Sequence, residues 1–323
     1  MHNSKLDWSV TGQRWRGSGI NFAALIIVNL LWATQYPAYK IAGDRMEPAA
    51  LNFWMLVLAL LSLFPLRLRE KRKLPDCSRG STWGTIYEYL VLGILGIVPP
   101  SVMLSWGISH SSASNAAILS LTIPVLMTGL GVVMLGEKFT LLRGFSLMLG
   151  LAGTLLISTS DLAQASFNRN LLIGNLIILI GGLGSAFYNT YSKSLLSRYS
   201  ELEVLINSYL VGAVACAFIS IAFEHTPFYI VAGYSAKTWG AIAVLGLLSW
   251  GVAMVLWMWV LNRLDVGQVS TSIYLLPLFG LILSILSVHE HISLSQVLGG
   301  VLTVIGTATL TLFENRQSKR ASE

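Results

Sequence analysis

The chain has 323 residues, of which 54% are hydrophobic and only 11% are charged, and its mean hydropathy is +0.68. A soluble globular domain carries about 25% charged residues, so this composition excludes an ordinary soluble protein and indicates an integral membrane protein. The net charge of +6 could suggest a nucleic-acid partner. The charged residues, however, are confined to connections between apolar segments, where they orient a protein in the membrane.

The apolar segments predict an all-α protein with ten transmembrane helices. Each segment is close to the ~20 residues that a helix needs to cross about 30 Å of hydrocarbon. A polar tail, 1–21, precedes them and a second tail, 314–323, follows. The ten segments are 22–41, 49–66, 86–108, 115–135, 142–159, 171–192, 203–223, 238–260, 268–288 and 294–313.

The basic residues predict the orientation of these helices. If both termini are cytoplasmic, seventeen of the 21 Lys and Arg residues lie on the cytoplasmic side, and Lys40 lies near the end of the first segment. The outside connections then hold only Arg45, Arg169 and Lys237. Such an excess on one side indicates cytoplasmic termini.

The sequence repeats itself with a spacing of 153 residues. Four pairs of residues share this spacing: Lys40 and Lys193, Pro124 and Pro277, Glu137 and Glu290, and Gly153 and Gly306. The spacing predicts two repeats, 22–159 and 171–313, joined by a polar connector, 160–170. Because each repeat has five segments, the second enters the membrane from the opposite face, so the repeats are inverted around a central cavity. This arrangement is typical of a transporter with its substrate site between the halves.

Polar and aromatic residues follow several segments at steps of three or four, which places them on one helix face. In a membrane helix such a face points to a cavity or to a partner helix. We expect the substrate to contact twelve residues: Asn29, Trp32, Gln35, Tyr36, Met103, Trp106, Ser185, Tyr188, Trp250, Trp257, Ser270 and Tyr274. Such a pocket suits an amino acid, or an organic cation held by cation–π contact. Taken singly, each aromatic residue could instead belong to the interfacial belt or to helix packing.

Prolines and glutamates mark equivalent places in the two repeats. A proline inside a helix removes a backbone hydrogen bond and bends the helix, so Pro124 and Pro277 predict paired kinks that could gate a cavity. Glu137 and Glu290 end their segments, where a carboxylate opposes the helix dipole. We therefore expect a structural role for them, in which Lys138, Arg143 or a neighbouring loop holds the carboxylate.

Other features of the sequence limit the partners and the chemistry that we expect. Glycines gather in the fifth and tenth segments, which predicts close helix contact, as a scaffold or as the surface of a homodimer. The sequence has no nucleotide-binding loop, no HExxH or GxSxG motif and no Cys or His spacing typical of a metal site. We expect a small-molecule substrate and the lipid bilayer as partners, no nucleic acid, no cofactor, no metal and no enzymatic activity.

Four stretches of the sequence carry a family resemblance: LLWATQYPAYK at 30–40, NAAILSLTIPVLMTGLGVVMLGEKFT at 115–140, GSAFYNTYSK at 184–193 and STSIYLLPLFGLILSILSVHEHIS at 270–293. With them the chain resembles the ten-helix EamA-type permeases of the drug/metabolite transporter superfamily, from about residue 20 to residue 313. In the second repeat, His289 and His291 flank Glu290 where Gly-Glu-Lys or Gly-Glu-Arg is more usual in that family.

The resemblance implies a location in the bacterial inner membrane, alternating access and, in many members, export of amino acids or related metabolites. From it we expect export of an amino acid or amine. The alternatives are an importer or exchanger of organic cations or sugar derivatives, and a non-transporting assembly or sensor protein.

Overall fold

The computed structural model describes residues 8–43, 45–70, 82–103, 105–107, 119, 121–157, 169–231, 233–276, 278–279 and 294–320. These residues form helices joined by turns and loops, with no strand among them. Four helical stretches in this part of the chain are long and apolar enough to cross a membrane: Pro48–Arg69, Thr82–Gly107, Glu201–Phe223 and Ala236–Arg263. Shorter apolar helices accompany them. The all-helical expectation is therefore confirmed.

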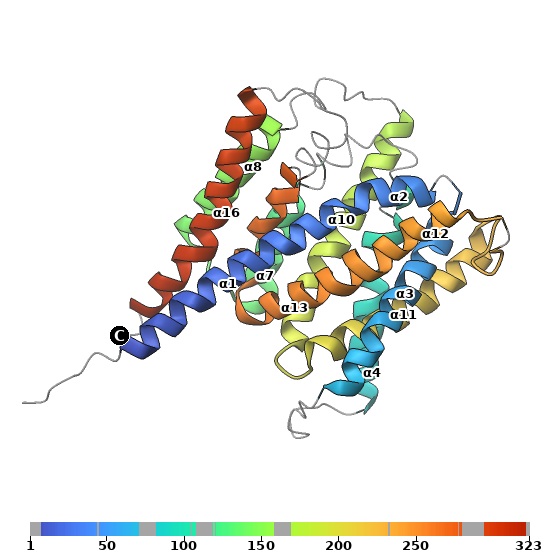
Figure 1. Cartoon of the computed structure of the whole chain (residues 1–323), viewed down its shortest axis with the longest axis horizontal. Coiled ribbons are helices and arrows are strands. Elements are labelled where there is room, and N and C mark those ends of the chain that lie inside the picture. Colours follow the sequence, from blue (N-terminus) through green and yellow to red (C-terminus); the bar gives the residue numbers. More distant parts are fainter. Residues whose placement is uncertain are drawn as a thin grey trace, which may run out of the picture.

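The helices fall into two series along the chain (Figure 1). The first series comprises α1 (Trp8–Ala33), α2 (Gln35–Gly43), α3 (Pro48–Arg69), α4 (Thr82–Gly96), the π-helical η2 (Pro99–Met103), α7 (Ile123–Leu135) and α8 (Leu141–Ile157). The second comprises α10 (Arg169–Leu195), α11 (Glu201–Phe223), α12 (Ala236–Ala243), the π-helical η3 (Val244–Val252), α13 (Ala253–Arg263), α14 (Val266–Ser270), the 3₁₀-helical η4 (Thr271–Tyr274) and α16 (Leu294–Arg320).

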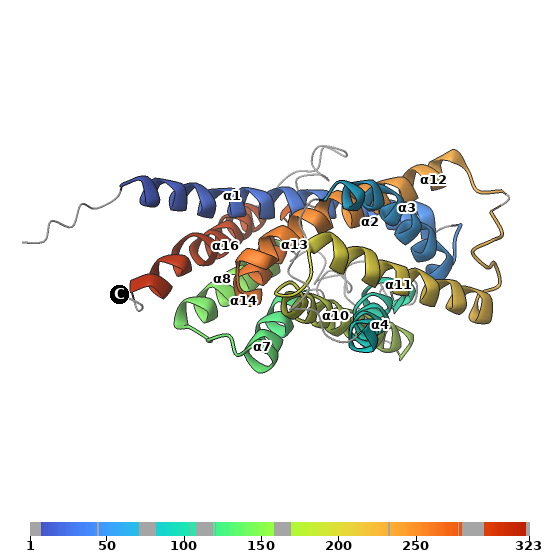
Figure 2. The same ribbon diagram turned by 90° about the horizontal axis from the view of Figure 1, so that it is seen from below.

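Equivalent helices of the two series pack against each other. α3 begins at Pro48 and α11 at Glu201, and α8 begins at Leu141 and α16 at Leu294, so both pairs keep the spacing of 153 residues. α3 packs along α11, and α8 packs along α16. The second pair is the green and red pair in Figure 1, and Figure 2 shows α10 and α13 between the two pairs.

Glycines bring α8 and α16 into close contact. A Cβ atom on Gly153 would lie 2.6 Å from the carbonyl oxygen of Gly299, and one on Gly306 would lie 3.0 Å from that of Ser146. Any side chain would therefore separate the two backbones. The glycine-rich faces of these two helices serve a contact within one chain.

The outer surface of the bundle is apolar. Trp83 on α4 is 81% exposed, and Val214 and Phe218 on α11 are 70% and 68% exposed. Exposed apolar side chains of this size on long apolar helices are the surface that lipid covers. The outer face of the helices is thus suited to the hydrocarbon of a bilayer.

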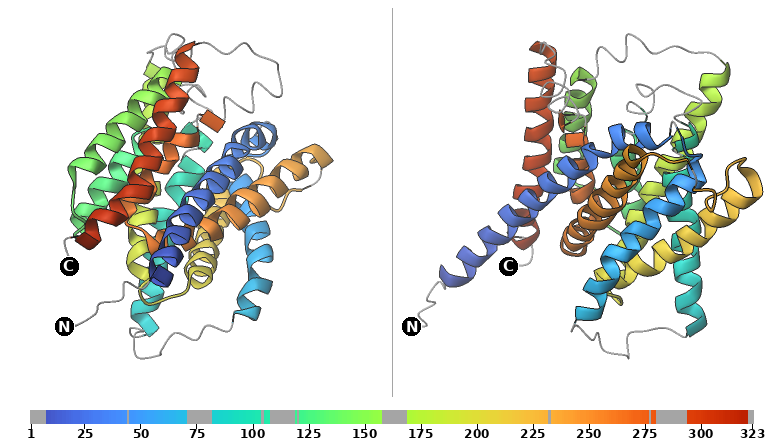
Figure 3. Two further views of the ribbon diagram at one scale, coloured as in Figure 1. Left: turned by 60° about the vertical axis from the view of Figure 1, so that its left-hand side comes forward. Right: turned by 45° about the vertical axis from the view of Figure 1, so that its right-hand side comes forward.

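Side-chain hydrogen bonds join helices near both ends of the molecule. Both termini and the turns that join α10 to α11 and α13 to α14 lie toward one end of the molecule (Figures 1 and 3). At this end Arg198 donates a hydrogen bond to Oε1 of Glu88 at 2.6 Å, which raises the pKa of the guanidinium above its usual value. At the opposite end, Oε2 of Glu224 after α11 accepts from the backbone N–H of Ala50 at 2.9 Å, in the first turn of α3. A carboxylate is favourable at a helix N-terminus, so this bond ties α11 to α3.

Candidate functional site

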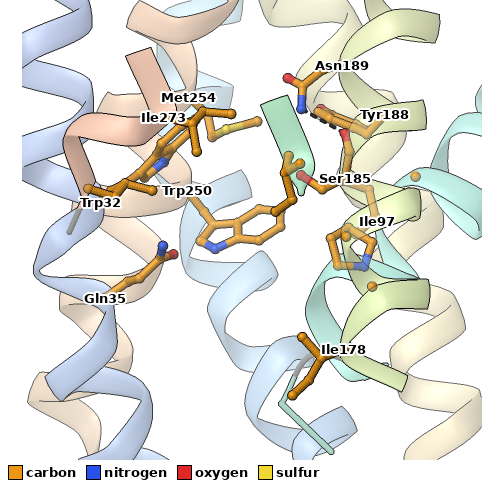
Figure 4. A pocket seen from close by; sticks show the side chains of 16 residues that line it. Trp32, Gln35, Ile97, Ile178, Ser185, Tyr188, Asn189, Trp250, Met254 and Ile273 are labelled. Atoms are coloured by element: carbon orange, nitrogen blue, oxygen red, sulfur yellow. Dashed lines mark hydrogen bonds between the residues drawn. The ribbon is translucent and has the colours of Figure 1, made fainter. Parts of the chain in front are cut away.

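A cavity of about 140 Å³ lies in the middle of the bundle, between α1, α10 and η3 (Figure 4). Helices from both series form its wall. Sixteen residues line it: Trp32, Gln35, Gly96, Ile97, Pro100, Ile123, Ile178, Gly181, Gly182, Ser185, Tyr188, Asn189, Trp250, Met254, Ile273 and Leu276.

The first series contributes Trp32 and Gln35, which flank a break in the first helix. α1 ends at Ala33 and α2 begins at Gln35, with a turn at Thr34 between them. Pro37 has no N–H to donate to the carbonyl of Ala33, so the regular helical bonding cannot run through this point. The hydroxyl of Thr34 donates to the carbonyl oxygen of Leu31 at 2.7 Å and stabilises the turn. The N-terminal end of α2 is thereby placed beside the cavity.

Gln35 and Ser185 face the cavity from opposite sides. Gln35 belongs to the first series and Ser185, on α10, to the second, and Trp250 extends between them in Figure 4. Within the described part of the chain, neither the amide of Gln35 nor the hydroxyl of Ser185 has a hydrogen-bond partner. A polar group in an apolar wall gains from a hydrogen bond. These two groups can therefore bind a polar ligand without breaking a bond to any described residue.

Asn189 sits one helical turn after Ser185 and is 6% exposed. Its Nδ2 donates to the carbonyl oxygen of Ser185 at 2.8 Å, and its Oδ1 accepts from the indole N–H of Trp257 at 2.5 Å. Because a side-chain amide carries two N–H groups, Asn189 keeps one donor beyond these two bonds. Trp257 is completely buried, and its ring centre lies 4.8 Å from that of Trp32. The bond from Trp257 thus connects α10 to the aromatic wall.

Irregular helices surround the cavity. Pro100 in η2 and Trp250 in η3 line it, and both belong to π-helical segments. Pro99 and Pro100 lack the N–H groups that an α-helix needs, which accounts for the irregularity of η2. Single-turn π segments recur at functional sites, where they change the direction of side chains.

The lining carries no net charge among the residues whose side chains are described. Its polar members are amides, hydroxyls and indole rings. No group of three or more His, Cys, Asp or Glu side chains that could hold a metal ion occurs in the described ranges. The site is therefore suited to hydrogen bonding and aromatic contact.

A sequence model of the EamA-like transporter family matches the chain twice, at residues 19–159 and 172–312. Both ends of the two matches are 153 residues apart, which is the spacing of the repeat. The chain belongs to the EamA-like transporter family.

Two relatives match most of the length of this transporter. It is 24% identical to the uncharacterized transporter YoaV of Bacillus subtilis over 282 residues, which are 87% of this chain and 93% of YoaV. It is 26% identical to a probable terminal-alkyne amino-acid exporter of Streptantibioticus cattleyicolor over 292 residues, 88% of this chain and 90% of that protein. A solved crystal structure shares the fold with a TM-score of 0.76 and 20% identity, covering 93% of this chain and 99% of the other.

Five of the residues expected to contact substrate line the cavity of this EamA-family transporter: Trp32, Gln35, Ser185, Tyr188 and Trp250. Trp257 lies directly behind this wall, against Trp32. Ser270 and Tyr274 are buried away from the cavity: the hydroxyl of Ser270 is 3.2 Å from that of Thr128, and the ring of Tyr274 packs against Gly150.

The remaining expected residues lie elsewhere. Asn29 is buried in α1 and donates to the carbonyl oxygen of Leu25. Met103 and Trp106 do not line the cavity and are 37% and 44% exposed. The side chain of Tyr36, and the whole of Pro277 and Glu290, lie outside the described residues.

Pro124 and Glu137 are both described. Pro124 stands in the first turn of α7, after a turn at Leu121 and Thr122, so the predicted kink is an interruption that begins a new helix. A proline is tolerated there because the first N–H groups of a helix have no intrahelical partner. Glu137 pairs with Arg143, with 3.1 Å between Oε2 and Nη1.

Sequence reasoning left out Asn189 and the aliphatic part of the wall, such as Ile178 and Leu276. Asn189 follows Ser185 by four residues, which is the signal that could have identified it.

Proposed function

We propose that this transporter exports a small amino acid or related amine by alternating access through the cavity. One observation carries the proposal: Gln35 and Ser185, from different halves, both face the cavity with polar groups that bind no other described residue. A ligand that bonds to both would connect the two halves at the place where they meet.

The size of the cavity favours a small cargo. Its volume is about 140 Å³. A cavity of about 150 Å³ accommodates a molecule of the size of benzene, whereas drug-sized ligands occupy about 300–1,000 Å³. In this conformation the cavity therefore suits an amino acid better than a drug.

The chemistry of the wall favours neutral polar and aromatic recognition. Gln35, Ser185 and Asn189 offer hydrogen bonds, and the rings of Trp32 and Trp250 offer faces to an ammonium group by cation–π contact. An amine or a zwitterion satisfies both requirements. The relative from Streptantibioticus cattleyicolor, named a probable terminal-alkyne amino-acid exporter, is consistent with an amino acid as cargo.

The proposal includes ten membrane-spanning helices in two inverted repeats, with cytoplasmic termini in the inner membrane. The double family match and the pairing of α3 with α11 and of α8 with α16 support it. The excess of Lys and Arg on the side of the termini supports the orientation.

A second candidate is an importer or exchanger of organic cations. The two indole rings on the cavity favour it, because each offers a face for cation–π contact. A sugar derivative, or a role in assembly or sensing without transport, are weaker alternatives because neither uses the aromatic wall in this way.

Purified protein in liposomes separates these candidates. Metabolites that raise the thermal unfolding temperature in detergent are loaded as radiolabelled cargo, and flux is measured against empty liposomes. We expect a neutral amino acid or an amine to give saturable flux. Saturable flux of an organic cation alone would favour the second candidate, and absence of flux for every stabilising compound would refute transport.

A further inference from the structure

Three charged side chains join α7, α8 and α14 at the end of the molecule that carries both termini. Glu137 follows α7, Arg143 lies in the first turn of α8, and Asp265 precedes α14. One guanidinium nitrogen of Arg143, Nη1, is 3.1 Å from Oε2 of Glu137, and the other, Nη2, donates to Oδ2 of Asp265. The side chains of Arg143 and Glu137 are only 3% and 7% exposed, and that of Asp265 is 50% exposed.

Glu137 also binds the beginning of α14 directly. Its Oε1 accepts from the backbone N–H of Val266 at 2.6 Å, and its Oε2 accepts from that of Gly267 at 3.0 Å. These N–H groups have no partner within their own helix, and the positive end of the helix dipole favours a carboxylate. The carboxylate of Glu137 thus joins the chain just beyond α7 to the first turn of α14.

Glycines make room for this arrangement. Gly136 has a φ of 67°, which reverses the chain so that Glu137 folds back beneath α7. A Cβ atom on Gly131 would lie 3.0 Å from Oε2 of Glu137, and one on Gly267 would lie 3.2 Å from Nη1 of Arg143. A larger side chain at Gly131 or Gly267 would therefore crowd the charged groups of this contact.

Of the three charges in this contact, only that of Glu137 has a charged counterpart 153 residues away, Glu290. Positions 153 residues from Arg143 and Asp265 hold Gln296 and Ser112. An equivalent contact at the other end of the molecule would lack the central cation and one of its acids. The residues at the equivalent positions therefore cannot form the same set of ion pairs.

The contact lies on the side of the cavity that is closed by packed apolar residues. Asn189, on the cavity wall, is six residues from the end of α10, or ~9 Å along the helix axis. Trp257, Leu261 and Val269, from the elements that form this end, are completely buried.

We propose that Glu137, Arg143 and Asp265 form a latch that closes the end of the transport pathway on the side of the termini, and that this latch opens when the cavity is exposed there. The proposal rests on alternating access in the proposed function. A buried ion pair adds little stability by itself, but removing one partner leaves an unpaired buried charge, so the latch selects one arrangement of α7 and α14.

The accessibility of a cysteine at Val269 tests the latch. Val269 lies on α14, one turn beyond Asp265, and is completely buried. The chain has two cysteines, Cys77 and Cys216, which are replaced by serine and alanine before Val269→Cys is introduced. The rate of labelling by a membrane-impermeant maleimide is then measured in detergent and in vesicles that expose the side of the termini.

We expect Arg143→Gln to raise the labelling rate by about tenfold or more, because an open state that gains 1.4 kcal/mol becomes tenfold more populated. Asp265→Asn should raise it less, since Asp265 is half-exposed. The control is Arg198→Gln, which removes an ion pair to Glu88 at the same end but outside the latch and should leave the rate unchanged.

Equal labelling of the parent and of Asp265→Asn, in protein that elutes and melts as folded, would overturn the latch even if Arg143→Gln fails to fold. An equal rise for Arg198→Gln would also overturn it, since the effect would then be general loosening. The labelling experiment needs no substrate. Absence of flux in the parent would therefore refute the proposed function, whereas the labelling rates would still test the latch.

Discussion

The indole N–H of Trp257 donates a hydrogen bond to Oδ1 of Asn189 at 2.5 Å, and both side chains are buried. Trp257→Phe keeps a six-membered aromatic ring and removes the indole N–H donor, which leaves the amide oxygen of Asn189 unsatisfied. We expect the variant to lose about 1–3 kcal/mol of stability. We also expect slower flux, because Trp257 supports Trp32 on the cavity wall. Thermal unfolding and flux in liposomes measure the two effects. Trp83→Phe, at a residue that is 81% exposed, is the control and should change neither.

Gly182 tests whether the cavity selects cargo by size. It lines the cavity, and a Cβ atom there would lie 3.4 Å from Cγ1 of Ile123, an ordinary contact. Gly182→Ala should therefore fold normally and reduce the cavity by about one methyl group. We expect flux of larger cargo to fall by more than that of smaller cargo. Gly129→Ala, where a Cβ atom meets nothing within 4 Å, is the control. An unchanged ratio of the two fluxes in Gly182→Ala would place the cargo elsewhere.

The contact between α8 and α16 predicts a difference between two glycines of one helix. Gly153→Ala would bring a methyl group 2.6 Å from the carbonyl oxygen of Gly299, whereas Gly144→Ala would place it 3.4 Å from the side chain of Phe139. Overpacking of this kind costs about 1–3 kcal/mol. We expect a lower unfolding temperature for Gly153→Ala and an unchanged or higher one for Gly144→Ala. Equal unfolding temperatures would show that the two helices separate freely.

Much of the fold followed from the sequence because its signals are local. Apolar segments of about 20 residues predict membrane helices, and the spacing of 153 residues between Pro124 and Pro277 reappears in the starts of α3 and α11. The stripes on the first and sixth segments placed Trp32, Ser185 and Tyr188 on the cavity because α1 and α10 are regular up to those residues. Gln35 also lines the cavity, although it follows the break at Thr34.

Trp257 and Tyr274 lie off the cavity at places where helices depart from α-geometry. Trp250 and Trp257 are seven residues apart, which places them on one face of an α-helix. The π-helical η3 ends at Val252, between them, and each residue added to a turn rotates the following side chains by about 100°. Trp257 consequently lies behind the wall. The 3₁₀-helical η4 likewise directs Tyr274 toward Gly150.

Two further expectations depended on contacts that span the sequence. Nothing local to Glu137 indicates the N–H groups of Val266 and Gly267, which are about 130 residues away. Glycines in the fifth and tenth segments predicted close contact but could not say whether the partner was the same chain. The packing of α8 on α16 answers that question for their glycine-rich faces, and a homodimer through their other faces stays a prediction.

Flux through liposomes that contain the double variant Gln35→Leu and Ser185→Ala tests the central claim most directly. Each lost hydrogen bond should weaken cargo binding by about 0.5–1.5 kcal/mol, which is roughly a factor of 2 to 10. We predict saturable flux for the parent protein, and for the double variant a KM raised by about 5- to 100-fold at an unchanged unfolding temperature. Parental flux and KM in the folded double variant would contradict the account, because the cargo would then cross without using this cavity.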